Sequence, residues 1–382
     1  MQRRRVISSL GTWLGASVSG VWSGAALAQA GGGGNRIVLG QSAPFSGKAE
    51  QLGVQYHLGA KLFFDELNAR GGVNGRTIEL VRLDDGYEPE RCVANTKQLI
   101  ADGVFALFGY VGTPTAQAAL PLATEAKVPF FAPLSGAQSL REPFNRYVFH
   151  VRASVMDETS AIVRQTQSVG IRKFAVFHQN DTDGQAGLEG VKRALKALDL
   201  APLATATVDR NSIEVSKAVA DIVAARPEAI IQIGAYRACA SFIRQARQKG
   251  FMGNFYNVSF VGTQALMDEL GSEAKGVSVS QVVPFPYAAA TPLSREYIAV
   301  HKDQRGIVPN YSGMEGYVAA KAFAEAVRRA GRNLTREGFV AAVESLRDVD
   351  LGGFPLDFAP DRHTGSRFVE LTLLTGDGRV RR

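Results

Sequence analysis

Cysteine is scarce in this chain, which has only two, Cys92 and Cys239, among 382 residues. This scarcity excludes the small scaffolds that are held together by several disulfides. A single disulfide is an open alternative in an oxidising compartment, but the two cysteines belong to different predicted helices in different halves of the chain. We therefore expect two small buried side chains that are not cross-linked.

Catalytic and metal-binding patterns are also missing. There is no P-loop, and Gly109 and Gly112 do not complete a dinucleotide-binding glycine motif. The five histidines lack the spacing of zinc ligands. Ser135 has neither the flanking glycines of a nucleophile elbow nor an evident histidine partner, which argues against a secreted α/β hydrolase. Asp84 and Asp85 would point to opposite faces of a strand and would not share a proton. We expect no enzyme, no cofactor and no metal.

Basic residues are not gathered into a nucleic-acid-binding surface. The formal net charge is +7 at pH 7, and three of these charges are the arginines of the N-terminal leader. No run of lysine or arginine is interleaved with aromatic residues, so nucleic acid is not an expected partner. The hydrophobic fraction of 46% and the charged fraction of 21% are those of a globular protein. A length of 382 residues favours two domains.

The N-terminus has the layout of a secretory signal. Arg3 to Arg5 precede an uncharged, weakly apolar run, 6–27, which ends in two A-x-A sites, at 26–28 and 28–30. The arginines and the glycine-rich run also suit twin-arginine export, and the export route stays open. An uncleaved membrane anchor is the alternative, because the run is nearly long enough to span a bilayer. Its many small residues argue against an anchor, and no cysteine follows that could carry a lipid. We predict that residues 1–30 are a cleaved signal peptide and that the protein is periplasmic.

Strand and helix patterns alternate from residue 36 onwards. Strands are expected at 36–40, 77–83, 105–108, 128–132, 173–177, 203–208, 229–233, 254–258 and 276–283. Helices are expected at 54–69, 88–101, 113–126, 156–168, 185–198, 215–225, 237–249, 264–270, 292–304, 314–330 and 335–345. A final β-hairpin is expected from 352–358 and 367–374. The alternation predicts an α/β fold with two doubly wound parallel-sheet lobes.

The stretch from Phe105 to Leu140 contains the first candidate binding feature. Its two turns follow parallel strands, at the edge where open α/β sheets hold ligands. We expect Thr113 to be the N-cap of the helix that follows, with Pro114 as its first residue. The hydroxyl groups of Thr115 and Ser135 flank this helix start, an arrangement that suits a small anion such as a carboxylate. The alternative, in which these hydroxyl groups only cap their own helices, is left open.

Four blocks of sequence carry a family resemblance. The segment 38–47, NARGGVNGR at 68–76, LDDGYEP at 83–89 and the stretch 109–140 resemble the leucine/isoleucine/valine-binding proteins, which are type I periplasmic solute-binding proteins of ABC importers. The resemblance implies two lobes joined by a three-segment hinge, with the ligand in the cleft between them. It places 36–150 plus 285–348 in the first lobe and 151–284 plus 349–382 in the second.

The resemblance also implies a set of ligand-binding residues. The groups expected to hold an amino-acid carboxylate are Thr113, Leu134, Ser135 and Gly136. Tyr236 corresponds to the aromatic residue that the second lobe closes over the ligand, and Asp157 corresponds to a polar residue at the first crossing between the lobes.

Three positions depart from the family pattern. Leu52 stands where the family often has an aromatic residue, and Asp183 replaces a frequent tyrosine. Ser259 stands where amino-acid binders place a glutamate against the ligand ammonium group, and a buried ammonium without a carboxylate partner is costly. Asp183 lies in a segment, 181–184, that is expected to form a turn. If its side chain points into the cleft it can replace the missing glutamate, and otherwise a carboxylate without an amine is expected.

Together these features predict a monomeric periplasmic substrate-binding component of an ABC importer, whose partners are a small carboxylate and a membrane permease. Branched-chain or other amino acids are the first ligand candidates, and aromatic or aliphatic acids without an amine are the alternative. A ligand sensor of the same fold is the alternative function.

Overall fold

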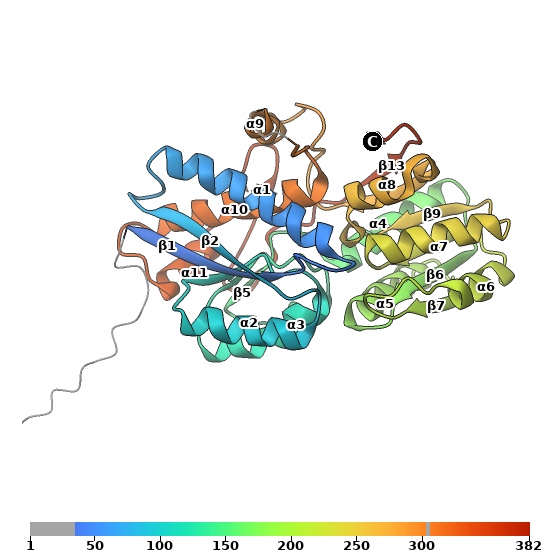
Figure 1. Cartoon of the computed structure of the whole chain (residues 1–382), viewed down its shortest axis with the longest axis horizontal. Helices are drawn as coiled ribbons and strands as arrows, with labels where there is room; N and C mark the ends of the chain where they lie inside the picture. The colour runs from blue at the N-terminus through green and yellow to red at the C-terminus, as the bar shows by residue number, and fades with distance from the viewer. Residues whose placement is uncertain (1–34, 303–305) are drawn as a thin grey trace, which may run out of the picture. The chain divides into compact units, whose positions relative to one another are not determined.

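The computed structural model describes residues 35–302 and 306–382. The predicted signal peptide, residues 1–30, lies outside the described residues. Within the described part of the chain, no helix combines the length and the apolar character that crossing a membrane requires. Two large β-sheets organise this part, one of five strands and one of seven (Figure 1).

The first sheet has the strand order β2-β1-β3-β4-β5, and all of its pairings are parallel. Its strands are β1 (Arg36–Ala43), β2 (Thr77–Asp84), β3 (Ala106–Phe108), β4 (Phe130–Phe131) and β5 (Val148–Phe149). The helices between them are α1 (Glu50–Ala69), α2 (Pro89–Ala101) and α3 (Thr113–Glu125), followed by the short 3₁₀ helix η1 (Gln138–Leu140). The sheet thus has the alternating strand–helix order that the sequence predicts.

The second sheet has the order β14-β13-β10-β9-β8-β6-β7. Its strands are β6 (Phe174–Gln179), β7 (Ala204–Val208), β8 (Ala229–Ile233), β9 (Asn254–Asn257), β10 (Val277–Gln281), β13 (Glu370–Leu374) and β14 (Val380–Arg381). The helices in this part are α4 (Val155–Ser168), α5 (Thr182–Lys196), α6 (Ser216–Ala224), α7 (Tyr236–Gln248) and α8 (Thr263–Leu270), with the 3₁₀ helices η2 (Ser259–Val261) and η3 (Gly271–Ala274). The strands from β6 to β10 pair in parallel, whereas β13 is antiparallel to both of its neighbours, β10 and β14.

The chain returns to the first sheet after β10. Helix α9 (Pro292–His301) leads into α10 (Tyr311–Ala330) and α11 (Arg336–Glu344). Helix α10 packs closely on α1, because a Cβ atom at Gly59 would lie 1.8 Å from the carbonyl oxygen of Gly313, and one at Gly316 would lie 2.0 Å from that of Tyr56. Only glycine permits this approach of the two backbones. The chain therefore passes between the two sheets three times, after β5, after β10 and after α11, and forms the two parallel-sheet lobes with a three-segment hinge that were predicted.

Aromatic side chains hold α10 and α11 on the first sheet. The ring of Phe323 on α10 lies 6.1 Å from that of Phe108 on β3 and 5.4 Å from that of Phe131 on β4. Phe339 on α11 lies 5.6 Å from Phe105. All five rings are buried, and aromatic rings dominate the energetics of such contacts. Helices from the C-terminal third thus complete a lobe that begins at residue 36, although the lobe boundaries given above are still predictions.

Two local predictions are wrong. The expected hairpin of 352–358 and 367–374 does not form, since β12 (Pro355–Leu356) pairs with β11 (Val349–Asp350), and β13 pairs with β10 and β14. Strand β13 pairs with the edge of β10 instead. This pairing joins segments that are distant in sequence, so the residues of a local turn cannot predict it. Helix α1 begins at Glu50, four residues before the predicted start, within a segment expected to be a loop.

Candidate functional site

The two turns of the central stretch lie side by side, as the sequence predicts. The backbone N–H of Leu134 donates to the carbonyl oxygen of Tyr110 at 2.8 Å, and Gly112 donates to Leu134 at 3.1 Å. These bonds extend the pairing of β3 and β4 beyond the strands and bring two buried hydroxyl groups together. The Oγ1 atom of Thr113 and the Oγ atom of Ser135 are 2.7 Å apart.

Thr113 is not the N-cap of α3. Gly112 holds that position with a φ of 92°, and a Cβ atom there would lie 2.1 Å from the ring of Tyr87. The side chain of Thr113, the first helical residue, leaves its own helix and donates to Asp183 Oδ1 at 2.5 Å. Thr115, by contrast, donates to the carbonyl oxygen of Val111 at 2.5 Å, within its own turn. The capping interpretation is thus wrong for both residues, because neither hydroxyl group accepts from a backbone N–H at the start of α3, although that of Thr115 does bond within its own turn.

Asp183 points inward, and its segment is not an isolated turn. Asp181 caps α5 and accepts from the backbone N–H groups of Asp183 at 3.0 Å and Gly184 at 3.1 Å, which fixes Asp183 in the first helical turn. The Asp183 side chain is buried, and its Oδ2 atom has no hydrogen-bond partner. Burial raises the pKa of Asp183 to about 7, and the nearby charge of Asp181 adds to the shift. This carboxyl group is therefore poised to change its charge near neutral pH.

A buried charge cluster, formed by Arg152, Glu158 and Glu315, lies at the first crossing between the lobes. The Arg152 guanidinium is 2.8 Å from Glu158 on α4 and 3.2 Å from Glu315 on α10, so it links elements of both lobes. It also donates to the hydroxyl group of Ser259. Burial by itself lowers the pKa of Arg152, but Glu315 and Glu158 outweigh burial and raise it. Burial raises the pKa of Glu315 despite the neighbouring guanidinium.

The carboxylate of Glu158 lies next to Ser259, the position at which the family resemblance implies a glutamate. Its Oε2 atom accepts from the backbone N–H of Ser259 at 2.7 Å and from the hydroxyl group of Ser280 at 2.6 Å. The sequence interpretation did not include Arg152, Glu158 or Glu315. A signal was present, because Glu315 is a lone acid within a run of small and apolar residues, YSGMEGYVAA at 311–320. Such a charge in a buried helix requires a partner.

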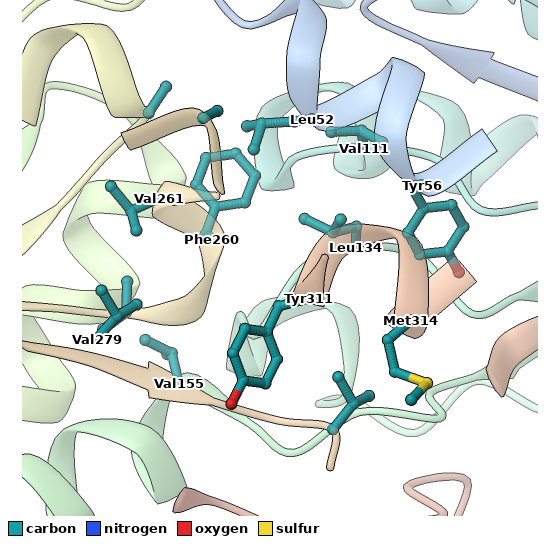
Figure 2. Close-up of a cluster of buried hydrophobic side chains, with 14 of the residues drawn as sticks. Leu52, Tyr56, Val111, Leu134, Val155, Phe260, Val261, Val279, Tyr311 and Met314 are labelled. Carbon is teal, nitrogen blue, oxygen red and sulfur yellow. The ribbon is translucent and has the colours of Figure 1, made fainter. Parts of the chain in front are cut away.

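Apolar side chains of both lobes form one buried cluster (Figure 2). Leu52 of α1 lies against the backbone of the second lobe, since a Cβ atom at Gly262 would come within 2.4 Å of its Cδ2 atom. Figure 2 shows Phe260 next to Leu52, with Val111 and Leu134 on the side of the first lobe. The ring of Phe260 also lies 6.0 Å from that of Tyr87. Leu52 thus helps to form an apolar wall, as an aromatic residue would.

Three predicted ligand-binding residues remain, namely Tyr236, Gly136 and Asp157. Tyr236, the first residue of α7, is buried and its hydroxyl group has no hydrogen-bond partner. Gly136 accepts from the backbone N–H of Val155 at 2.7 Å, and a Cβ atom on it would collide with that backbone. Asp157 is not brought into the cluster, because its carboxylate accepts from the backbone and hydroxyl groups of Ser154 and completes a capping box.

Three of the buried polar atoms that lack partners lie in the second lobe or at the first crossing segment. Asp183 Oδ2, Tyr236 Oη and Arg152 Nε are buried and unpaired. Buried polar groups are nearly always hydrogen-bonded, so unpaired ones call for an explanation. Asp183 contacts the paired hydroxyl groups through Thr113, and the charge of Arg152 acts on Asp183, so an acceptor and a donor are available there to a small polar molecule.

No catalytic or metal centre emerges from the described residues. They contain no cluster of three or more His, Cys, Asp or Glu side chains that could hold a metal ion. Asp84 accepts from the hydroxyl group of Ser46 and Asp85 from that of Ser42, so the two carboxyl groups have separate partners. Cys92 and Cys239 are both free and buried, as predicted.

The sequence model of the periplasmic binding protein family matches residues 36–378. An amino acid binding protein of Pseudomonas aeruginosa is 27% identical over 303 residues, which cover 78% of this chain and 79% of that protein. A solved structure from Rhodopirellula baltica, described as a possible leucine/isoleucine/valine-binding protein, is 33% identical with a TM-score of 0.87, and the match covers 94% of this chain and 97% of that one. A substrate-binding periplasmic protein from Ralstonia solanacearum is 34% identical with a TM-score of 0.85, and covers 90% of this chain and 99% of its own. The chain therefore belongs to the family of periplasmic binding proteins, whose members bind ligands and are not enzymes.

Proposed function

We propose that this protein is the periplasmic substrate-binding component of an ABC importer, and that it binds an amino acid or a related small carboxylate between its two lobes. The observation that carries the proposal is the contact of Thr113 with Asp183, which joins a hydroxyl group at the edge of the first sheet to a buried carboxyl group of the second lobe. The names of the relatives, an amino acid binding protein and a leucine/isoleucine/valine-binding protein, support the same ligand class.

The hydroxyl groups of Thr113 and Ser135 would donate to the carboxylate of the ligand. At present Thr113 donates to Asp183, so ligand entry requires the two side chains to separate and both to exchange partners. A hydrogen bond to a charged group contributes about 1.5–3 kcal/mol, which makes this exchange favourable if the ligand offers both a carboxylate and a donor. Separation of the lobes about the three crossing segments would open the path, as in other two-lobed binding proteins.

Charge balance favours a ligand with an ammonium group. Three buried carboxyl groups, on Glu158, Glu315 and Asp183, lie near the guanidinium of Arg152. The guanidinium of Arg141 also acts on Glu158 and Glu315, so the carboxyl groups outnumber the cations by one. Glu158 already accepts from three donors, whereas Asp183 Oδ2 accepts from none. An ammonium group beside Asp183 would satisfy this oxygen and keep the carboxyl group ionised. Asp183 would thus supply the carboxylate partner for the ammonium group, which Ser259 cannot supply.

An acid without an amine is the competing ligand, and proton counting separates the two. The pKa of Asp183, about 7, means that the group is roughly half protonated at neutral pH. An amino acid would drive the proton off Asp183 as it binds, whereas an amine-free acid would keep the proton or take one up. Calorimetry at pH 7 in two buffers of different ionisation enthalpy measures this proton transfer directly.

The test begins with a thermal-shift screen of amino acids and of aromatic and aliphatic acids, since a ligand at about 100 times its dissociation constant stabilises by about 2.7 kcal/mol. For a ligand found this way, we expect Thr113→Ala and Ser135→Ala to weaken binding by about tenfold or more with folding intact. Thr115→Ala is the matched control, because its hydroxyl group bonds only within its own turn. Equal losses in Thr115→Ala and Thr113→Ala, or none in either, would contradict the proposed site.

Export and partnership complete the proposal. Residues 1–30 would be the signal peptide that directs the chain to the periplasm, where the monomer would deliver its ligand to a membrane permease. The periplasmic relatives support this location.

A further inference from the structure

One cavity of the described structure has neither Thr113 nor Asp183 in its lining. Its volume is about 660 Å³, within the range of small-molecule sites. The first lobe contributes the segment around η1, residues 138–144, and the second lobe contributes the start of α4 and one face of α5. The third crossing segment, residues 361–367, completes the wall. Of the ligand-binding residues predicted from the sequence, only Asp157 lines this cavity.

Four arginines line the cavity, namely Arg141, Arg193, Arg362 and Arg367. Arg362 forms an ion pair with Asp357 at 2.5 Å. Within residues 35–302 and 306–382, none of the other three has a carboxylate oxygen within ion-pair distance, although several exposed arginines elsewhere do, such as Arg70 and Arg91.

Arg141 is the most constrained of these cations. Its guanidinium donates to the carbonyl oxygens of Ala137 at 2.9 Å and Arg152 at 3.3 Å, and its Nε atom is buried without a partner. Burial, together with the charge of Arg152, lowers the pKa of Arg141 to about 9, although the charges of Asp157, Glu158 and Glu315 act in the opposite direction. Backbone dipoles orient the group, but they do not supply a counter-ion.

None of the acidic groups in the wall forms an ion pair with Arg141, Arg193 or Arg367 in the described part of the chain. The carboxylate of Asp157 accepts from Ser154, and Glu142 and Asp361 are exposed without an ion pair in the described chain. His363 adds no positive charge at neutral pH, because burial lowers its pKa. Among the described residues, the cavity therefore offers three guanidinium groups that form no ion pair, from the first lobe, from the second lobe and from a crossing segment.

We propose that this cavity is a second binding site, for a small oxyanion that bears a carboxylate or phosphate group, and that Arg141, Arg193 and Arg367 hold it. The planar guanidinium group matches both kinds of oxyanion with two parallel hydrogen bonds. Because the three arginines come from both lobes and from a segment that connects them, the bound anion fixes one arrangement of the lobes in preference to others.

The experiment uses inorganic phosphate and citrate as probes on the full mature protein, at low ionic strength and with chloride as the reference anion. Isothermal titration should show saturable binding to the native chain. The variant Arg193→Gln/Arg367→Gln, which changes two exposed side chains without ion pairs, should bind at least fivefold more weakly. Arg332→Gln/Arg347→Gln is the matched control, since both arginines are exposed, lack ion pairs in the described chain and lie outside the cavity. Arg141 is left unchanged, because its contacts with backbone carbonyl groups make its loss a folding risk.

Preference among the probes identifies the chemistry: stronger binding of citrate supports a carboxylate ligand, and stronger binding of phosphate supports a phosphorylated one. No saturable binding of either probe would overturn the proposal, and so would equal affinity in the native chain and the Arg193/Arg367 variant. Titration of the Thr113→Ala/Ser135→Ala protein distinguishes the two sites, because loss of probe binding there would mean that the anion occupies the interlobe site.

Discussion

Asp183→Asn should make the protein more stable and weaken its binding of amino acids. Asparagine has nearly the same shape and can still accept from Thr113 Oγ1, which now lies 2.5 Å from Asp183 Oδ1. It cannot ionise. The substitution thus isolates the effect of the buried charge from the effect of packing.

The stability effect follows from the pKa of Asp183, which is raised by burial from the ordinary 3.8 to about 7. Below pH 3.8 the carboxyl group is protonated in both the folded and the unfolded chain, and it costs nothing. Between about pH 4 and pH 7 the folded chain retains a proton that the unfolded chain releases, so the stability of the native protein falls as the pH rises. Above pH 7 the loss levels off at about 4 kcal/mol, an upper bound for a group that can relax or be hydrated.

We therefore expect Asp183→Asn to unfold at a higher denaturant concentration than the native protein at pH 8, and at about the same concentration at pH 4. Chemical unfolding curves at a series of pH values provide the assay. Asp102→Asn is the control, since Asp102 is exposed at the end of α2 and should show no such pH dependence.

Ligand binding should change in the opposite direction. Loss of a charged partner for an ammonium group costs about 1.5–3 kcal/mol, so amino acids should bind roughly tenfold to more than a hundredfold more weakly. An acid without an amine should bind at least as well as before. A variant with unchanged stability at pH 8 would refute the buried-charge reasoning, and unchanged amino-acid affinity would show that Asp183 is not the ammonium partner.

Three further predictions concern the cluster, the turn and the leader. Glu158→Gln should lower the free energy of unfolding by about 3–5 kcal/mol, because an amide nitrogen cannot accept a hydrogen bond from Arg152 or Ser259. Unfolding in guanidinium chloride measures the change. Glu214→Gln, at an exposed site, is the control and should have little effect. Gly112→Ala should lower the unfolding midpoint and abolish ligand binding, since its φ of 92° and the nearby Tyr87 ring both exclude a Cβ atom; normal binding would mean that the turn can shift without cost. N-terminal sequencing of the periplasmic protein should show cleavage after Ala28 or Ala30, whereas a full-length chain in the membrane fraction would refute export as a cleaved protein.

Local patterns in the sequence were sufficient for the order of strands and helices. Most helix ends fall within a few residues of the predicted ends, because apolar spacing and turn-forming residues specify the backbone conformation of their immediate neighbours. Helix α1 shows the limit: it begins at Glu50, where no side chain caps it and the preceding segment resembles a loop. The hairpin prediction near the C-terminus was wrong for a different reason. Strand β13 pairs with β10, which is about ninety residues away in the chain, and not with the short segment that precedes it.

The sequence by itself determined that the chain is an α/β protein of two parallel-sheet lobes, and that Thr113 and Ser135 lie in turns that follow two parallel strands of the first sheet. Only the tertiary structure decided where Asp183 points, since that depends on how α5 of the second lobe meets α3 of the first. It also decided that Arg152, Glu158 and Glu315 form one cluster, although they are spread over more than 160 residues. The physical reason is the same in both cases: the free energy of a buried charge depends on partners that are distant in sequence, whereas helices and strands are specified by their neighbours.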